Sequence, residues 1–141
     1  MSGLAPRPAV EGDLDDVHRI GARRFAAHWS RTALSEELRR NDSLFLVVPQ
    51  RGYALARVNG NRCELFDLAV EKDGMGWGKA LWLALKNEAR RRGCAAIQLE
   101  VSAANERAME FYGKCGAVVA GRRPKFYTDG SDAVLMDVAL T

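Results

Sequence analysis

The chain has 141 residues, 48% of them hydrophobic, which is enough to bury one sizeable core and leaves little room for a second. We therefore expect a single domain over residues 1–141. The net charge of +3 is too small to indicate a nucleic-acid-binding protein, so we expect no direct contact with nucleic acid, although a mildly basic surface suits an acidic ligand.

The N-terminal half combines helical and strand-like patterns of apolar residues. A helix beginning at Gly12-Asp13 has apolar residues at three- and four-residue spacings, and Ser30 has the position of an N-cap for a second helix. The Asn59-Gly60 pair lies between two apolar runs and is a strong hairpin signal. The expected elements are a short strand at 7–10, helices from 12 and from 30, and strands at 43–48, 52–58 and 62–70.

The C-terminal half alternates helix and strand patterns after a glycine-rich loop. The apolar stripe of a long helix starts near Lys79 and ends at Gly93. The nearly continuous apolar run at 95–101 is typical of a strand covered on both faces. A strand, helix and strand in this order predict a right-handed crossover on an α/β sheet. A helix at 105–115 and strands at 117–121 and 133–140 are expected to follow.

The glycine-rich loop between Asp73 and Lys79 has glycine at every second position. Glycine tolerates positive φ and leaves its N–H unshielded, so such a loop can cradle a phosphate at the positive end of the next helix. A nucleotide P-loop is excluded because Ala80 replaces the required Ser or Thr, and a dinucleotide fingerprint is excluded because its third glycine is missing. The alternative is a turn that binds no ligand.

The N-terminal segment, the length of the apolar runs and the cysteines indicate the cellular compartment. Residues 1–7 lack the apolar segment of a signal peptide, and no apolar run reaches the length of a membrane span. Three cysteines are an odd number, and their spacing fits no zinc site. We expect a cytoplasmic protein with reduced thiols, no bound metal and no contact with a membrane.

Four segments form a specific combination when taken together. They are Leu68-Ala69-Val70, the glycine loop, Leu99–Asn105 and Phe111–Gly116, and this combination resembles the acetyl-coenzyme A site of the GNAT N-acetyltransferases over roughly residues 7–140. The resemblance is strongest to the ribosomal-protein-alanine N-acetyltransferase (RimI) type, on the segments His28-Trp29-Ser30, Glu100-Val101 and Arg122–Tyr127. It implies an α/β (α+β) fold with a central mixed, mostly antiparallel sheet of about six to seven strands, a splayed parallel pair and about four helices.

The resemblance also implies roles for individual residues in acetyl transfer to an amine. Glu100 is expected to be the general base and Tyr112 the general acid that protonates the leaving thiolate, at the same interval as in the family's motif. The simpler alternatives are that Glu100 is a strand-end carboxylate facing water and that Tyr112 is a core aromatic. Asn105 is expected to contact coenzyme A, and its alternative role is the N-cap of a helix. The other expected acetyl-coenzyme A contacts are the main chain of Leu68, Ala69 and Val70, together with Asp73, Gly74, Met75, Gly76, Trp77, Gly78 and Lys79.

Two positions depart from the family pattern. Asp73 stands where the family has Gln or Arg, and a carboxylate there would repel a pyrophosphate, so we expect reduced affinity for acetyl-coenzyme A, with Lys72 or Lys79 supplying positive charge. Ala117 replaces a phenylalanine after Gly116, which removes a core aromatic but touches no chemistry.

The acceptor can be weighed by the cost of producing a neutral amine at pH 7. This cost is about 1.4 kcal/mol for an α-amine with pKa near 8 and about 5 kcal/mol for a lysine amine. A single carboxylate base therefore suits a protein N-terminus best, in agreement with the RimI-type resemblance. A small-molecule or lysine amine is the second hypothesis, and a GNAT-fold protein that binds coenzyme A or a partner without catalysis is the third. Trp29, Phe126 and Tyr127 are expected to line the acceptor groove, unless they serve in packing.

Overall fold

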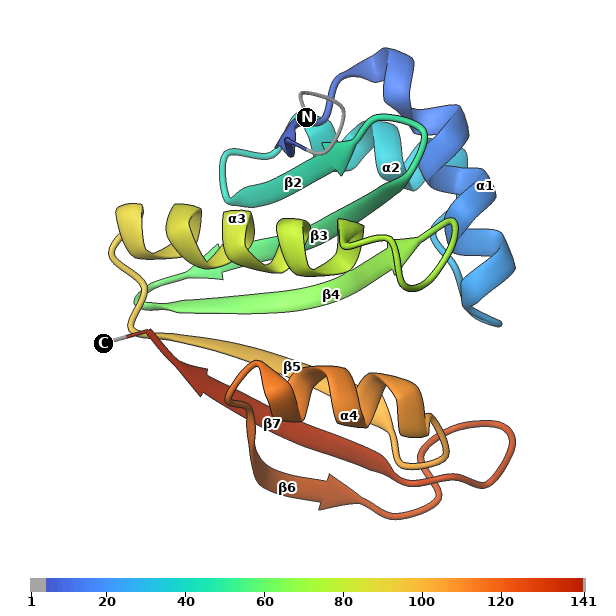
Figure 1. Cartoon of the computed structure of the whole chain (residues 1–141), viewed down its shortest axis with the longest axis vertical. Helices are drawn as coiled ribbons and strands as arrows, with labels where there is room; N and C mark the ends of the chain where they lie inside the picture. The colour runs from blue at the N-terminus through green and yellow to red at the C-terminus, as the bar shows by residue number, and fades with distance from the viewer. Residues whose placement is uncertain (1–4, 141) are drawn as a thin grey trace.

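The computed structural model describes residues 5–140, which form a seven-stranded mixed sheet with helices on both faces (Figure 1). The strand order is β1-β2-β3-β4-β5-β7-β6, and in the part of the chain that is described β4 and β5 are the one parallel pair. The predicted sheet and helices are confirmed. The strands are β1 (Arg7–Pro8), β2 (Ser43–Val48), β3 (Gly52–Asn59), β4 (Arg62–Val70), β5 (Ala96–Ser102), β6 (Val118–Arg123) and β7 (Ala133–Ala139). The helices are a short 3₁₀ turn (Glu11–Asp13), α1 (Leu14–Arg24), α2 (Arg31–Leu38), α3 (Trp77–Arg91) and α4 (Glu106–Lys114).

Local signals in the sequence account for several element ends. Ser30 Oγ accepts a hydrogen bond from the Ala33 N–H at 3.0 Å, as expected for the N-cap of α2. Gly93, with φ +84°, follows the end of α3. Gly60, with φ +63°, turns β3 into β4 as the Asn-Gly signal predicted. α3 begins at Trp77 rather than near Lys79.

Two apolar cores lie on the two faces of the sheet. α3 packs on one face over β2, β3 and β4, and α4 lies on the same side over β5 and β7 (Figure 1). Leu81 and Leu85 of α3 are fully buried there. On the other face, α1 and α2 bury Leu14, Ile20 and Leu34 against β2, β3 and β4. Each such side chain contributes roughly 1.5–3 kcal/mol through removal of apolar surface from water, which fixes the helices to the sheet.

β5 differs from its predicted environment. Ile97, Leu99 and Val101 are buried in the core beneath α3 and α4, whereas Gln98 and Glu100 alternate with them on the opposite face. α1 and α2 cover that face only over the first strands of the sheet, so β5 has apolar cover on one face. The prediction of a strand covered on both faces is therefore wrong.

β4 and β5 pair over only part of their length. Their register runs from Arg62 opposite Ala96 to Leu65 opposite Leu99, and the strands then diverge toward the end where α3 and α4 begin (Figure 1). At the same level β4 has a bulge, because Leu65 and Asp67 lie opposite consecutive residues of β3. A bulge bends its strand and increases the local twist. Beyond it, β4 stays paired with β3 and leaves β5, which opens a gap in the sheet.

A buried ion pair between Glu37 and Arg57 connects α2 to β3 of the sheet. Glu37, whose side chain is 1% exposed, accepts hydrogen bonds from Arg57 of β3 at 2.6 and 3.0 Å. We expect Glu37→Gln to lower the free energy of unfolding by about 2–3 kcal/mol, below the usual cost of breaking a buried pair because Arg57 is 32% exposed and stays partly hydrated. Urea denaturation monitored by circular dichroism measures this loss.

Asp42→Asn is the matched control for this prediction. Arg40 and Asp42 form an equally close pair with two hydrogen bonds at 2.8 Å, but both side chains are more than 40% exposed. Exposed pairs contribute at most about 1 kcal/mol, so the control should lose far less stability. Equal losses in the two variants would show that burial of Glu37 is not what makes its ion pair important.

Candidate active site

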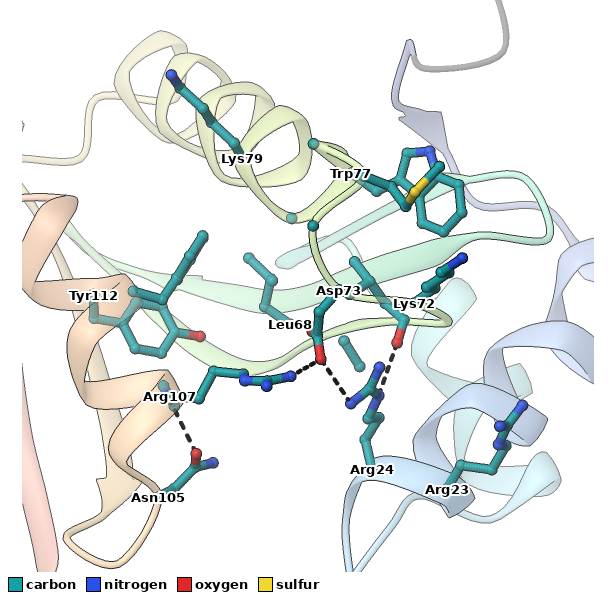
Figure 2. A pocket seen from close by; sticks show the side chains of 18 of the residues that line it. Arg23, Arg24, Leu68, Lys72, Asp73, Trp77, Lys79, Asn105, Arg107 and Tyr112 are labelled. Carbon is teal, nitrogen blue, oxygen red and sulfur yellow. Dashed lines mark hydrogen bonds and ion pairs between the residues drawn. The ribbon is translucent and has the colours of Figure 1, made fainter.

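A cavity of about 560 Å³ opens between the glycine loop and the first turns of α4 (Figure 2). Its volume lies in the range of small-molecule sites. Every residue predicted to contact acetyl-coenzyme A lies in its wall, and Tyr112 lies there too. The predicted residues are Leu68, Ala69, Val70, Asp73, Gly74, Met75, Gly76, Trp77, Gly78, Lys79 and Asn105.

The glycine loop turns into α3 through residues with positive φ. Gly74 and Gly76 have φ +80° and +85°, which glycine adopts without strain. Gly76 is the N-cap of α3 and has no side chain that could accept hydrogen bonds from the first turn. The first N–H groups of a helix have no partner within it and carry its positive end. The cavity therefore borders free donors in a setting that favours an anion.

The unpaired end of β4 supplies a second set of main-chain groups. The Glu71 N–H bonds to the Arg51 carbonyl on the β3 side at 2.7 Å, so Leu68 and Val70, which alternate with it, direct their main chain toward the gap. The Val70 carbonyl accepts a hydrogen bond from Arg24 Nε at 2.9 Å. A free strand edge of this kind can pair with an extended ligand.

Arginines that sequence reasoning missed lie around the loop. Asp73 Oδ2 pairs with Arg24 at 3.4 Å and also with Arg107 of α4 (Figure 2). The arginines at the end of α1 and at the start of α4 carried no signal of their own, because only the fold brings both helices to the loop. Asp73 thus lies between two guanidinium groups in the wall of the cavity. The cationic residues of this wall are Arg23, Arg24, Lys72, Lys79 and Arg107.

Tyr112 combines a buried ring with a hydroxyl directed at the cavity (Figure 2). The residue is 9% exposed, and its ring packs edge-on against Trp82 and Phe111, with centroids 6.0 and 5.2 Å away. Burial raises the pKa of the phenol above its ordinary value, and the nearby Cys115 and Asp67 raise it further. The hydroxyl therefore keeps its proton at neutral pH and is suited to donate it.

Asn105 is the N-cap of α4. Its Oδ1 accepts a hydrogen bond from the Ala108 N–H at 3.1 Å, which confirms the capping alternative, while the residue also lies in the cavity wall. One side chain can serve both purposes, because capping uses only the amide oxygen. Its contact with coenzyme A stays a prediction.

Glu100 lies on the other face of the sheet, in the wall of a second cavity of about 580 Å³. Its Oε1 is 3.6 Å from Arg123 Nη2, and its side chain is 35% exposed. Tyr127 lies in the same wall, and its pKa is raised by burial and by the neighbouring Glu100. Glu100 follows Leu99, the last residue of β5 that pairs with β4. Glu100 and Tyr112 thus approach the gap from opposite faces.

The three residues predicted for the acceptor groove are placed differently from one another. Tyr127 lies in the wall of the Glu100 cavity. Trp29 packs against Phe66, with ring centroids 5.8 Å apart, and Phe126 packs against Tyr127, with centroids 5.1 Å apart. Neither Trp29 nor Phe126 belongs to the wall of either cavity. Their geometry agrees with packing roles, and a role in acceptor binding stays a prediction.

Comparison with known proteins identifies the family. The model of the acetyltransferase (GNAT) family matches residues 14–117. The chain belongs to the GNAT acetyltransferase family. The [ribosomal protein bS18]-alanine N-acetyltransferase of Escherichia coli (strain K12) is 33% identical to this GNAT chain over 137 residues, which cover 92% of the chain and 93% of that protein. This similarity confirms the predicted resemblance to the RimI type.

Solved structures of GNAT proteins share the fold. The crystal structure of the ribosomal-protein-S18-alanine N-acetyltransferase from Escherichia coli superposes with a TM-score of 0.86 at 27% identity, covering 97% of this chain and 94% of that one. The PaiA N-acetyltransferase from Thermoplasma acidophilum, solved in complex with coenzyme A, has a TM-score of 0.78 at 24% identity and covers 95% and 97% of the two chains. This GNAT chain is accordingly an N-acetyltransferase.

Over residues 5–140 its helices are too short or too polar to span a membrane.

Proposed function

We propose that this GNAT enzyme transfers the acetyl group of acetyl-coenzyme A to the N-terminal α-amine of a protein, with an N-terminal alanine of a ribosomal protein as the leading acceptor. The observation that carries the proposal is the placement of Tyr112 and Glu100 on opposite sides of the gap between β4 and β5, with the glycine loop on the Tyr112 side. A proton donor and a proton acceptor thus face one reaction centre from two cavities.

The residues of the cavity beside the glycine loop fit acetyl-coenzyme A. The glycine loop and the uncapped start of α3 offer N–H donors for its pyrophosphate, and the free edge at Leu68 and Val70 offers main-chain partners for its pantetheine arm. Basic side chains in the wall suit its phosphates. Bound acetyl-coenzyme A would supply the thioester carbonyl that the amine attacks. The PaiA relative that was solved with coenzyme A supports this assignment.

Glu100 and Tyr112 divide the proton transfers of the reaction between them. Glu100 takes one proton from the acceptor ammonium, so that the nitrogen can form its bond to the acetyl carbon. As the carbon–sulfur bond breaks, the Tyr112 hydroxyl gives its proton to sulfur, and a second proton lost by the nitrogen restores the phenol. Burial keeps Tyr112 protonated until that step. The two residues therefore act in sequence from opposite faces of the sheet.

The preference for an α-amine follows from the chemistry of the base. Glu100 is one partly exposed carboxylate that is paired with Arg123. Releasing a proton costs an α-ammonium about 3 kcal/mol less than it costs a lysine side chain at pH 7. The curated Escherichia coli relative is named for acetylation of an alanine of ribosomal protein bS18, which supports an N-terminal acceptor.

The acceptor class is tested by thiol release from acetyl-coenzyme A with a panel of amines. The panel contains a peptide with a free N-terminal alanine, the same peptide with a blocked N-terminus and an internal lysine, and spermidine. We expect kcat/KM for the α-amine to exceed that for the lysine amine by at least about a hundredfold, because far more of the α-amine is neutral. Faster turnover of spermidine or of the blocked peptide would overturn the proposed acceptor.

Glu100→Gln and Tyr112→Phe should confirm that the acetylation is catalysed by these residues. Each variant should lose about 10²- to 10⁴-fold in kcat while still binding coenzyme A, since loss of a general base or acid typically has an effect of this size. Glu110→Gln, an exposed position on α4, is the control and should keep wild-type rates. Rates close to wild type in both test variants would refute the assigned roles, and coenzyme A binding without turnover of any amine would favour a non-catalytic protein.

Asp73 is expected to weaken the binding of coenzyme A by charge repulsion. Asp73→Asn keeps the size of the side chain and leaves Arg24 and Arg107 in place beside the loop. We expect calorimetric titration to show about fivefold tighter binding of coenzyme A to the variant, since removal of one like charge near a phosphate contributes about 1 kcal/mol in a hydrated setting. The gain should shrink at high salt.

Glu71→Gln is the control for this titration. Glu71 is another carboxylate near the loop, but it pairs with Arg51 and lies outside the cavity wall, so its variant should bind coenzyme A within about twofold of wild type. Weaker binding by Asp73→Asn would instead show that Asp73 organises the arginines for the ligand. No binding by the wild-type protein at millimolar coenzyme A would refute the cosubstrate.

A further inference from the structure

The bulge in β4 places Phe66 and Asp67 on the same face of the sheet. Leu65 and Leu68 belong to the core under α3, whereas Phe66 packs with the core under α1 and α2. Asp67 reaches Tyr53, which also belongs to that second core. In a regular strand, consecutive side chains point to opposite faces of the sheet. The extra residue of the bulge interrupts this pattern once, so two consecutive side chains lie on one face. Asp67 therefore lies on the face that carries Glu100.

Asp67 is a partly buried carboxylate without a cationic partner. Its Oδ2 accepts a hydrogen bond from the Tyr53 hydroxyl at 2.8 Å, and over residues 5–140 no Lys or Arg nitrogen lies within ion-pair distance of it. Burial raises its pKa, and the Tyr53 hydroxyl and the neighbouring His28 act in the opposite direction. Burying a carboxylate without a cation is costly, so this residue is poorly explained by stability alone.

The second oxygen of Asp67 remains free for a ligand. Tyr53 donates to Oδ2, and within residues 5–140 no hydrogen bond reaches Oδ1. Among the residues that the structure describes, Ser43 Oγ is the one fully buried side-chain polar atom without a hydrogen-bond partner. Asp67 Oδ1 also has no partner there, and because it is not fully buried it is accessible to solvent. Asp67 thus offers one oriented oxygen, held in place by Tyr53, to a donor that arrives from outside.

Asp67 and Glu100 flank the gap from its two strands. Asp67 lies on β4 beyond Leu65, and Glu100 lies on β5 beyond Leu99, just past the last pair of the parallel register. Phe66, the neighbour of Asp67 on this face, lines the same cavity as Glu100. Asp67 is also close enough to Tyr112 to raise the pKa of its phenol. Asp67 therefore lies at the same end of the gap as Glu100, on the same face of the sheet.

We propose that Asp67 binds the acceptor ammonium, as a second carboxylate that holds the cationic amine beside Glu100 until Glu100 takes its proton. This inference rests on the proposed function and specifies its acceptor as an amine that arrives protonated. The ammonium supplies the positive charge that Asp67 lacks, and its N–H groups can bond to Oδ1 and to Glu100 together. Tyr53 positions the carboxylate from behind.

The test is Asp67→Asn, assayed with the peptide that has a free N-terminal alanine. The variant keeps the shape of the side chain and an oxygen for the Tyr53 hydroxyl, but it removes the charge. We expect KM for the peptide to rise about tenfold or more, as for the loss of a charged hydrogen bond. The value of kcat should stay within about threefold of wild type, and KM for acetyl-coenzyme A should not change.

Tyr53→Phe and Glu36→Gln distinguish a direct contact with the ammonium from a structural role or a general charge effect. Tyr53→Phe removes the hydrogen bond that positions the carboxylate but keeps its charge, so KM for the peptide should rise by less than it does in Asp67→Asn. If Asp67 mattered only as an acceptor for Tyr53, Tyr53→Phe would raise KM, whereas Asp67→Asn, which keeps an accepting oxygen, would leave KM unchanged. Glu36, an exposed carboxylate of α2 that lies outside the walls of both cavities, controls for the general field of negative charge and should change KM less than about twofold.

Each result bears on one of the two proposals. If the wild-type protein acetylates no amine, the proposed function fails. If it acetylates the peptide and Asp67→Asn has an unchanged peptide KM, or loses kcat at constant KM, the assignment of Asp67 is overturned. Thermal unfolding establishes that each variant is folded, and Asp67→Ala is the second charge-removing variant if the Asn variant does not fold.

Discussion

The separation of β4 from β5 is the constraint on which the active site depends. A parallel pair is held by evenly spaced hydrogen bonds, and here they stop at Leu65 and Leu99. The bulge in β4 lies at the level where this pairing ends, and beyond it β4 stays paired with β3. The gap leaves main-chain groups of β4 without strand partners, and it lets side chains from the two faces approach one centre. A continuous sheet would have kept Glu100 and Tyr112 apart.

Electrostatics divides the two sides of this gap. On the α3 and α4 side, two helix N-termini and several basic side chains create a setting for phosphates. On the other side, carboxylates from β4 and β5 create a setting for a cationic amine. In the proposed reaction, the anionic cosubstrate and the cationic acceptor therefore approach the gap from different faces. Asp73 is the exception on the phosphate side, and Arg24 and Arg107 offset its charge.

Asp67 and Glu37 show how the surroundings of a buried acid indicate its purpose. Glu37 is fully buried and forms two hydrogen bonds with Arg57, so its charge is satisfied within the fold. Asp67 has one neutral donor and, among the described residues, no Lys or Arg within ion-pair distance. The first arrangement stabilises the native state relative to a broken pair, whereas the second leaves a cost that a bound ammonium can offset. Functional sites are where such costs are commonly found.

The sequence by itself determined the local features and the chemistry that depends on residue type. The N-cap at Ser30, the hairpin at Gly60 and the glycine loop are local, because each rests on the conformational preference of one or a few residues. The resemblance of the sequence to the GNAT motifs also named the residues that the structure gathers around one cavity. Only the tertiary structure decided which faces of the sheet the helices cover. It placed Glu100 on a face of β5 without apolar cover, although the apolar run had predicted a strand covered on both faces. It also brought Arg24 and Arg107 to Asp73 and left Asp67 without a Lys or Arg partner within residues 5–140, since these relations join segments far apart in the chain.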